Sequence, residues 1–81
     1  MPHYVYILRC TDNTLYTGST NSLEKRIHEH NNSKQGAHYT KIRRPVTLVY
    51  SEQVETLGDA RRREAEIKRL SREEKLSLIE K

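Results

Sequence analysis

Some side chains of this sequence have the types and spacing needed for chemistry on a phosphodiester. They are Tyr6, Tyr16, Arg26, His30 and Glu64. Together they supply two phenols, a guanidinium, an imidazole and a carboxylate. A guanidinium stabilises charge that develops on a phosphate, and a carboxylate can hold a divalent cation that polarises it. If the fold brings them together, the set is sufficient for metal-assisted cleavage of a phosphodiester.

Arg26 and His30 are four residues apart in a segment with helical periodicity, so both side chains can address one point in space. Arginine offers fixed charge to an anionic transition state, and histidine can transfer a proton near neutral pH. The structural alternative is an arginine that extends past the core edge beside a histidine that caps the helix C-terminus. There an imidazolium is favoured, so these two residues alone do not decide between the readings.

Glu64 falls within the apolar stripe of a predicted helix, between Leu57 and Ala60 on the helical wheel and near Ile67. A carboxylate in such a stripe is costly unless it is paired or binds a metal. The structural alternatives are an ion pair with a nearby arginine, or a stripe that lies at the rim of the core. The pattern alone does not decide between these alternatives and a metal ligand.

Tyr6 and Tyr16 could orient or deprotonate a water molecule. An unperturbed phenol has a pKa near 10, so a tyrosine base would need Arg26 or a cation to lower that value. The structural alternative is a tyrosine ring buried in the core with its hydroxyl hydrogen-bonded. Gly18 lies in a predicted strand and permits the close approach of another backbone or a ligand.

The elements that must position these residues follow from the sequence pattern. Alternation predicts strands over 4–10, 15–19 and 45–51, the first two forming a hairpin with turn residues between them. Helices are predicted after an Asn21 N-cap, after an Asp59 N-cap as far as about Leu70, and after the capping box Ser71-x-x-Glu74. The order β-β-α-β-α-α predicts an α+β fold, a three-stranded antiparallel sheet flanked by helices. The register of the hairpin, and so the relative face of the two tyrosines, stays open.

The composition fits one small domain over residues 1–81. Apolar residues make up 33% of the 81 residues, charged residues 32%, and the formal net charge is +4. No acidic residue lies between Glu29 and Glu52, a segment that favours phosphate backbones unless it is an ordinary solvated loop. The candidate nucleic-acid contacts in this segment are Lys34, His38, Tyr39, Lys41, Arg43 and Arg44.

Cys10 is the sole cysteine, which excludes an intramolecular disulfide and a CxxC zinc site, and we expect it to be a small buried hydrophobe. The apolar run near the N-terminus is too short for a signal peptide or a membrane span, because Arg9 interrupts it. The expected location is therefore the cytoplasm.

The joint order of these motifs resembles the GIY-YIG nuclease superfamily, and in particular its small stand-alone bacterial members of uncharacterised function. Tyr4-Val5-Tyr6 stands at the first motif and Tyr16-Thr17-Gly18 at the second. The segment 19–30 resembles the family helix that carries an arginine and, one turn later, a histidine or tyrosine. Glu64 corresponds to the metal-binding glutamate. The segments 36–40 and 43–46 match the small bacterial members more narrowly.

The resemblance implies hydrolysis of phosphodiester bonds in DNA with one Mg²⁺ or Mn²⁺ ion held by Glu64. Tyr6 would activate the nucleophile, directly or through water, and Tyr16 would position water or phosphate. Arg26 would stabilise the developing charge and His30 would assist proton transfer. Tyr39 is a candidate additional contact to the substrate.

The sequence departs from the family pattern at its first motif, where Tyr4 replaces a glycine, and it has no asparagine after Asn32. The leading hypothesis is a metal-dependent endonuclease that is selective for branched or damaged DNA and linked to repair or recombination. A protein partner would then supply specificity. The alternatives are a nucleic-acid-binding adaptor with little turnover and a protein-interaction module that uses the charged terminal helices.

Overall fold

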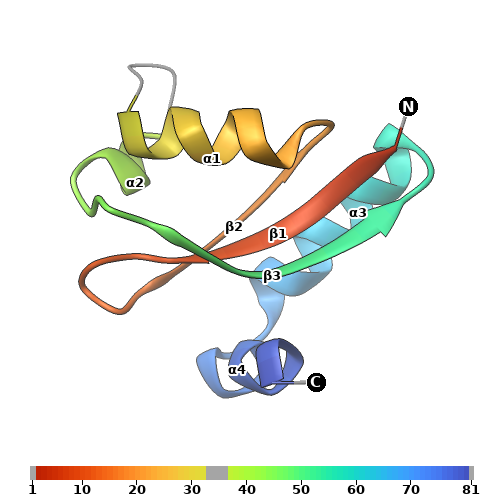
Figure 1. The fold of residues 1–81 in the computed structure, drawn as a ribbon. Coiled ribbons are helices and arrows are strands. Elements are labelled where there is room, and N and C mark those ends of the chain that lie inside the picture. Colours follow the sequence, from red (N-terminus) through yellow and green to blue (C-terminus); the bar gives the residue numbers. More distant parts are fainter. Residues whose placement is uncertain (1, 33–36, 81) are drawn as a thin grey trace.

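A three-stranded antiparallel sheet with helices on both faces forms the molecule (Figure 1). The structure, a computed structural model, describes residues 2–32 and 37–80. The strands are β1 (His3–Arg9), β2 (Leu15–Thr20) and β3 (Thr47–Val54). The helices are α1 (Leu23–Asn32), α2 (His38–Lys41), α3 (Leu57–Arg69) and α4 (Arg72–Glu80). This architecture confirms the predicted α+β class. In the described part of the chain, no helix is long and apolar enough to span a membrane.

The β1–β2 hairpin fixes the face on which the candidate tyrosines lie. Its turn is closed by a hydrogen bond from the Cys10 N–H to the Thr14 carbonyl, with Asn13 at a positive φ of 68°. Tyr6 then lies opposite Gly18, and Leu8 lies opposite Tyr16. Because side chains alternate along a strand, Tyr6 and Tyr16 share one face of the sheet. The register that the sequence left open thus brings both phenols to the same side.

The strand order is β2-β1-β3, so β1 is central and is covered on both faces. Val5, Tyr6, Ile7 and Leu8 are all buried as a result. The pairing of β1 with β3 shifts register between Ile7 and Leu8. The predicted bounds 45–51 were wrong for the third strand, which begins two residues later and extends to Val54 because its end pairs with the start of β1.

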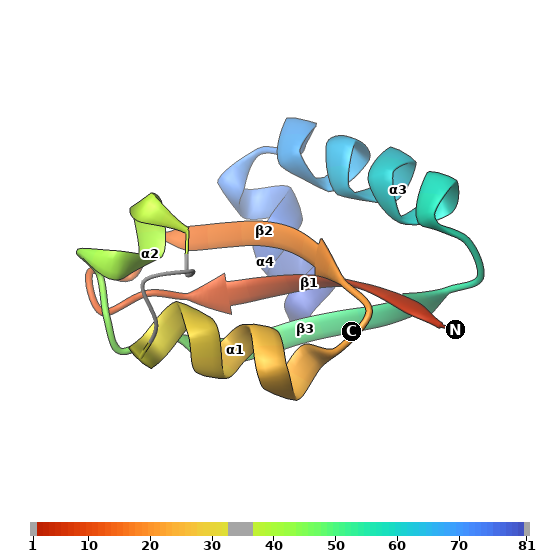
Figure 2. The ribbon, with the colours of Figure 1, turned by 90° about the horizontal axis from the view of Figure 1, so that it is seen from above.

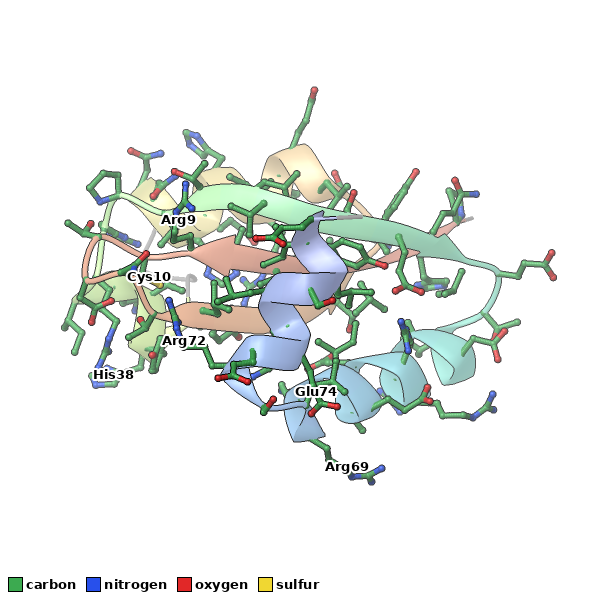
Figure 3. All side chains as sticks on the ribbon, turned by 90° about the horizontal axis from the view of Figure 1, so that it is seen from below. Arg9, Cys10, His38, Arg69, Arg72 and Glu74 are labelled. Atoms are coloured by element: carbon green, nitrogen blue, oxygen red, sulfur yellow. The ribbon has the colours of Figure 1, made fainter. Side chains whose placement is uncertain are left out.

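Each face of the sheet has its own apolar core. On one face Tyr6, Leu8, Cys10 and Val46 pack with side chains of α1. On the other face Val5, Ile7, Ala60 and Ile67 form the core cluster, and Leu70, Leu78 and Ile79 of the C-terminal segment pack against it. Viewed from above, α1 and α3 lie on opposite sides of the sheet (Figure 2). From below, α4 crosses the strands (Figure 3). The prediction that Cys10 is a small buried hydrophobe is confirmed.

The predicted capping box at the start of α4 is confirmed, whereas two other predicted caps were wrong. The Ser71 N–H donates to Glu74 Oε1 at 2.9 Å, and the Glu74 N–H donates to Ser71 Oγ at 3.1 Å. Helix α1 begins at Leu23, with the Arg26 N–H donating to the Ser22 carbonyl, so Ser22 takes the N-cap position that was predicted for Asn21. Helix α3 is capped by Thr56, whose hydroxyl accepts the N–H of Asp59. Asp59 was therefore misassigned as the cap and lies in the first turn.

Helix α2 was not predicted, because a single turn leaves no periodic pattern in the sequence. Hydrogen bonds tie the chain just after it to the β1–β2 turn. The Thr11 N–H and hydroxyl both donate to the Arg43 carbonyl at 3.0 Å. The Arg43 guanidinium donates in turn to Asp12 Oδ2 at 3.0 Å and to the Tyr39 carbonyl at 2.9 Å. These bonds hold α2 against the sheet beside the end of α1.

Candidate active site

A tyrosine and a histidine form a buried hydrogen-bonded pair between β1 and α1. The Tyr6 hydroxyl oxygen lies 2.8 Å from His30 Nε2, and both residues are almost completely shielded from solvent. On the other side of the imidazole, His30 Nδ1 lies 2.7 Å from Thr40 Oγ1 of α2. The two ring nitrogens therefore each have one partner, and the imidazole joins the sheet to α2.

Burial favours the neutral form of both members of this pair. It lowers the pKa of His30 from 6.5 to about 4, with nearby Arg26 and Arg44 adding to the effect and Glu29 opposing it. Burial also raises the pKa of Tyr6 to about 12; a hydrogen bond from Arg26 opposes this rise, while Tyr16 and Glu64 add to it. The alternative of a charged histidine that caps the C-terminus of α1 does not hold in this structure.

Arg26 lies at the solvent-facing edge of the pair. Its guanidinium hydrogen-bonds the Tyr6 phenol and forms an ion pair with Glu29, with 3.1 Å between Nη1 and Oε1. Arg26 is half-buried, because its side chain crosses the rim of the α1 core. A guanidinium in this position places positive charge beside the Tyr6 oxygen and remains within reach of the surface.

Tyr16 borders the imidazole from β2. Its ring meets that of His30 edge to face, with 5.2 Å between centroids. It also stacks with Tyr39, with centroids 5.9 Å apart and 27° between the planes. The Arg43 guanidinium carbon lies 3.9 Å from the centroid of the Tyr39 ring. Tyr39 thus lies among protein groups and supports Tyr16, which leaves less of its ring for stacking on a base than the sequence alone suggested.

Gly18 makes room for the Tyr6 phenol. A Cβ at this position would lie 2.5 Å from the Tyr6 hydroxyl oxygen, 2.7 Å from Cζ and 3.2 Å from Cε2 of Tyr16. No Cβ atom tolerates contacts this short with a ring that cannot move. A close approach at Gly18 was expected from another backbone or a ligand, whereas in the structure it comes from a side chain, the Tyr6 phenol of the neighbouring strand.

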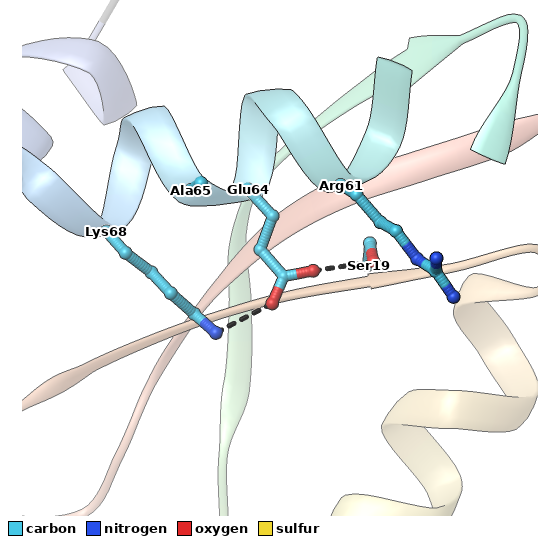
Figure 4. A pocket seen from close by; sticks show the side chains of 5 residues that line it. All are labelled: Ser19, Arg61, Glu64, Ala65 and Lys68. Carbon is cyan, nitrogen blue, oxygen red and sulfur yellow. Dashed lines mark hydrogen bonds and ion pairs between the residues drawn. The ribbon is translucent and has the colours of Figure 1, made fainter. Parts of the chain in front are cut away.

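Glu64 lies on α3 at the edge strand β2 and is partly buried (Figure 4). Its Oε1 accepts a hydrogen bond from Ser19 Oγ at 2.7 Å, and Oε2 pairs with Lys68 Nζ at 2.7 Å. Burial raises its pKa, but the bonds from Lys68 and Ser19 outweigh this and leave the pKa below its usual value. The predicted alternative of an ion pair is realised, with Lys68 in place of an arginine.

The structure brings Tyr6, Tyr16, Arg26 and His30 together, and Glu64 approaches them from the other side of β2. Ser19, the hydrogen-bond partner of Glu64, follows Gly18 and so faces away from the tyrosine pair. The charge of Glu64 nevertheless contributes to the raised pKa of Tyr6. The carboxylate and the phenol are therefore coupled electrostatically across the edge strand.

A surface pocket at Glu64 is the candidate metal site. Its volume is about 350 Å³, and it is lined by Ser19, Arg61, Glu64, Ala65 and Lys68. Among residues 2–32 and 37–80, no group of three or more histidine, cysteine, aspartate or glutamate side chains could hold a metal ion. Mg²⁺ often keeps several water ligands and binds through one or two carboxylates together with substrate phosphates. The Glu64 carboxylate and the neighbouring Ser19 hydroxyl are hard oxygen donors of the type that Mg²⁺ takes, and Lys68 would have to leave the carboxylate for such an ion to bind.

The candidate nucleic-acid contacts lie in different surroundings. His38 and Tyr39 are exposed and Lys41 is partly exposed on or next to α2. Arg43 is bonded to Asp12 and Tyr39, as described above. Arg44 donates to the carbonyls of Glu29 and His30 at the end of α1. Lys34 lies outside the described residues.

Sequence reasoning missed Thr40, Ser19 and Lys68. Thr40 is the partner of His30 Nδ1, and the other two bind the Glu64 carboxylate. Lys68 follows Glu64 by four residues, a spacing that indicates a helical ion pair. No pattern in the sequence marks Thr40 or Ser19, because both make contact across long separations in the chain.

Comparison with known proteins gives similarity over nearly the whole chain. A family model described as the GIY-YIG catalytic domain matches residues 2–77. A UPF0213 protein of Syntrophus aciditrophicus is 60% identical over 77 residues, which cover 95% of this chain and 88% of that protein. One of Staphylococcus saprophyticus is 58% identical, with 95% and 93% coverage. The solution NMR structure of a UPF0213 protein of Bacillus halodurans is 44% identical and superposes with a TM-score of 0.63, covering 99% of this chain and 84% of that one.

Proposed function

Because the chain belongs to the GIY-YIG catalytic domain family, whose fold is that of nucleases, we propose that it is an endonuclease that hydrolyses phosphodiester bonds in DNA with a divalent metal ion. The observation that carries this proposal is the buried Tyr6–His30 pair with Arg26 bonded to the same phenol. A tyrosine with a purely structural role would need only one hydrogen-bond partner for its hydroxyl. Here an acceptor of its proton and a cation for its oxygen meet at one hydroxyl.

In the proposed reaction Tyr6 moves a proton between the attacking water and His30. The Tyr6 hydroxyl gives its proton to His30 Nε2, and its oxygen takes a proton from the water that attacks phosphorus. His30 is neutral at pH 7, and burial, which lowers its pKa to about 4, also makes it a weak base, so it takes the Tyr6 proton only as the Tyr6 oxygen takes one from the water. Arg26 opposes the rise in the pKa of Tyr6 and so favours the phenolate. The same guanidinium is placed to stabilise charge on the phosphate.

Glu64 is the proposed ligand of the metal ion, Mg²⁺ or Mn²⁺. Such an ion polarises the phosphate and stabilises the leaving oxygen. Ser19 orients the Glu64 carboxylate through its hydrogen bond, and Lys68 balances its charge until the site is loaded.

The substrate is proposed to lie across β2, between the Tyr6 pair and the Glu64 pocket. Tyr16 borders the imidazole there and would position water or the scissile phosphate. Arg61 lines the pocket and has no hydrogen bond or ion pair to other described residues, so its charge is available to a phosphate. His38, Tyr39 and Lys41 extend this surface along α2, and Arg43 and Arg44 hold its backbone in place. Lys34 remains a proposed contact.

One observation favours a second function, a DNA-binding adaptor with little turnover. Both carboxylate oxygens of Glu64 are occupied by protein groups, Ser19 and Lys68. If Lys68 is not displaced, the basic surface would still bind DNA without cutting it. In either case we propose that the natural substrate is branched or damaged DNA, in repair or recombination, and that a protein partner supplies specificity.

The decisive experiment incubates the purified protein with labelled branched, nicked and single-stranded DNA, with and without Mg²⁺ or Mn²⁺. Glu64→Gln should abolish metal-dependent cleavage while DNA binding persists, because Glu64 holds the metal and no phosphate. Glu66→Gln is the matched control, an exposed glutamate of the same helix, and should cut like the wild type. Binding without cleavage by the wild type would favour the adaptor. Cleavage by Glu64→Gln at the wild-type rate would remove Glu64 from the mechanism.

A further inference from the structure

A buried hydroxyl lies directly behind the catalytic imidazole. Thr40 is fully shielded from solvent, and its Oγ1 is 2.7 Å from His30 Nδ1. The proposed chemistry gives this residue no role. Its position on the far side of the ring from Tyr6 means that it can act on the reaction only through His30.

The direction of the hydrogen bonds follows from the partners at each end. Thr40 donates its hydroxyl proton to the Ala37 carbonyl at 2.9 Å, as threonine often does within a helical turn. Its oxygen can then only accept from His30, so Nδ1 carries the proton. In a neutral imidazole Nε2 is then unprotonated and accepts the Tyr6 hydroxyl at 2.8 Å.

The opposite tautomer leaves the chain of bonds incomplete. With the proton on Nε2, that nitrogen would donate to the Tyr6 oxygen, which already accepts from Arg26. The Tyr6 proton would then have no acceptor among the described residues, at a buried position. A buried donor without a partner destabilises the folded state. The arrangement with the proton on Nδ1 satisfies every group from Tyr6 to Ala37.

We propose that Thr40 is a positioning residue that holds His30 as the Nδ1–H tautomer, so that Nε2 is free to take the proton of the Tyr6 hydroxyl. The proposal rests on the proposed function. When the Tyr6 proton moves to Nε2 and the Tyr6 oxygen takes a proton from the water, His30 becomes an imidazolium and Tyr6 stays neutral. Thr40 continues to accept from Nδ1–H in both states, so the ring need not turn during the reaction.

The surroundings of α2 give Thr40 a fixed place. The Thr40 and Lys41 N–H groups both donate to the Ala37 carbonyl, and the Thr40 carbonyl accepts from the Arg43 N–H. Arg43 is in turn bonded to the β1–β2 turn through Asp12 and Thr11. The short helix therefore holds the Thr40 hydroxyl against His30 from the end of the sheet where the hairpin turns.

The test is the tautomer of His30, read from ¹⁵N and ¹H NMR of the imidazole in protein without metal or DNA. The wild type should show Nδ1 protonated and Nε2 bare. Thr40→Val keeps the shape of the side chain and removes the acceptor, so the Nε2–H form should appear. Thr40→Ser should restore the wild-type pattern. Thr17→Val is the matched control, because Thr17 is also buried and its hydroxyl has no hydrogen-bond partner within the described residues.

Cleavage kinetics provide the second readout. Thr40→Val should lower kcat on the order of 10²-fold with KM little changed, since general-base catalysis is impaired and DNA binding is not. Thr40→Ser should recover most of that loss. A wild-type Nε2–H tautomer, or a Thr40→Val spectrum identical to the wild type, would overturn the proposal whether or not the protein cuts DNA. The predicted spectra from a protein without nuclease activity would sustain the positioning role and reject the proposed function.

Discussion

His30 is shielded from water, and this sets the charge it carries at neutral pH. Groups from every packed element face it: Tyr6 of β1, Tyr16 of β2, Arg26 and Glu29 of α1, and Arg44 beyond α2. Two of these are cations, which disfavour an imidazolium further. The folded protein therefore resists protonation at this position, and the unfolded chain does not.

This difference predicts acid sensitivity. The pKa of His30 falls from 6.5 to about 4 on folding. Between these values the unfolded chain binds a proton that the folded state does not, so the free energy of unfolding should rise with pH over this window. The gain is at most about 3 kcal/mol. Urea unfolding at intervals from pH 4 to 7 measures it. His30→Gln should flatten the dependence, whereas the exposed His28→Gln should keep it; a slope that survives in His30→Gln would assign the effect to another group.

Gly18 gives a second prediction at the scale of one residue. Gly18→Ala forces a Cβ to within 2.5 Å of the Tyr6 hydroxyl oxygen, and the ring is enclosed. We expect a loss of stability of about 1–3 kcal/mol, as for other overpacked cores, together with loss of the Tyr6–His30 bond. Gly58→Ala is the control, because its Cβ meets only Thr56 Oγ1 at 3.8 Å inside a helix. That variant should be stabilised by up to about 1 kcal/mol. Equal effects in thermal unfolding would contradict the steric account.

At the scale of elements, periodic patterns were sufficient for most of the fold. Alternation located the strands, and the box at Ser71 and Glu74 located α4. The caps at Ser22 and Thr56 were missed because Asn21 and Asp59 have equally suitable side chains, and only the backbone decides which carbonyl starts the helix. Helix α2 was missed because its single turn is too short for a periodic pattern of apolar residues to appear in the sequence.

Residue types and their spacing predicted which residues form the candidate site, but not the contacts among them. Tyr6, Tyr16, Arg26 and His30 meet as the motifs indicated, but the register of Tyr6 opposite Gly18 depends on the turn geometry and could not be read from the chain. The Thr40–His30 bond depends on the fold of the chain between α1 and β3. Such contacts leave no local signal in the sequence.

Because α4 packs on the sheet, shortening an apolar side chain on its packed face should lower the free energy of unfolding. Ile79 packs against the cluster of Val5 and Ile7, whereas Ile42 is 69% exposed in the segment after α2. Ile79→Ala should lower the free energy of unfolding by about 2 kcal/mol, the low end for a buried aliphatic residue, because Ile79 is only partly buried. Ile42→Ala should change it by less than about 0.5 kcal/mol. Urea unfolding of both variants tests this; an Ile79 variant as stable as the Ile42 variant would mean that α4 contributes no packing.

The whole molecule is a thin slab, with a radius of gyration of 12.0 Å and extents of 30, 29 and 18 Å. A domain of this size is expected to have a radius near 12 Å, so the chain is compact. Among the described residues, Arg61 lies at the Glu64 pocket, and His38, Tyr39 and Lys41 lie on α2. Arg72 lies on the face where α4 covers the sheet (Figure 3).

This distribution of charge predicts the salt dependence of DNA binding. Contact with about three phosphates gives a slope of roughly −3 in a plot of log K against log salt concentration. Arg61→Gln should reduce the slope by about one, and Arg72→Gln should leave it unchanged. Fluorescence anisotropy with a labelled duplex at several salt concentrations measures the slopes. A flat plot for the wild type would support the protein-interaction module over both nucleic-acid hypotheses.

The bonds of Glu64 to Ser19 and Lys68 have a consequence for how the molecule is built and handled. A carboxylate cluster that relied on a cation for its cohesion would come apart in a chelator, as zinc fingers do. Here the Glu64 carboxylate is already paired with Lys68 of the same helix, so the protein does not need a bound metal ion in order to fold. EDTA should therefore abolish DNA cleavage without unfolding the protein. Adding Mg²⁺ or Mn²⁺ back should restore cleavage without a refolding step.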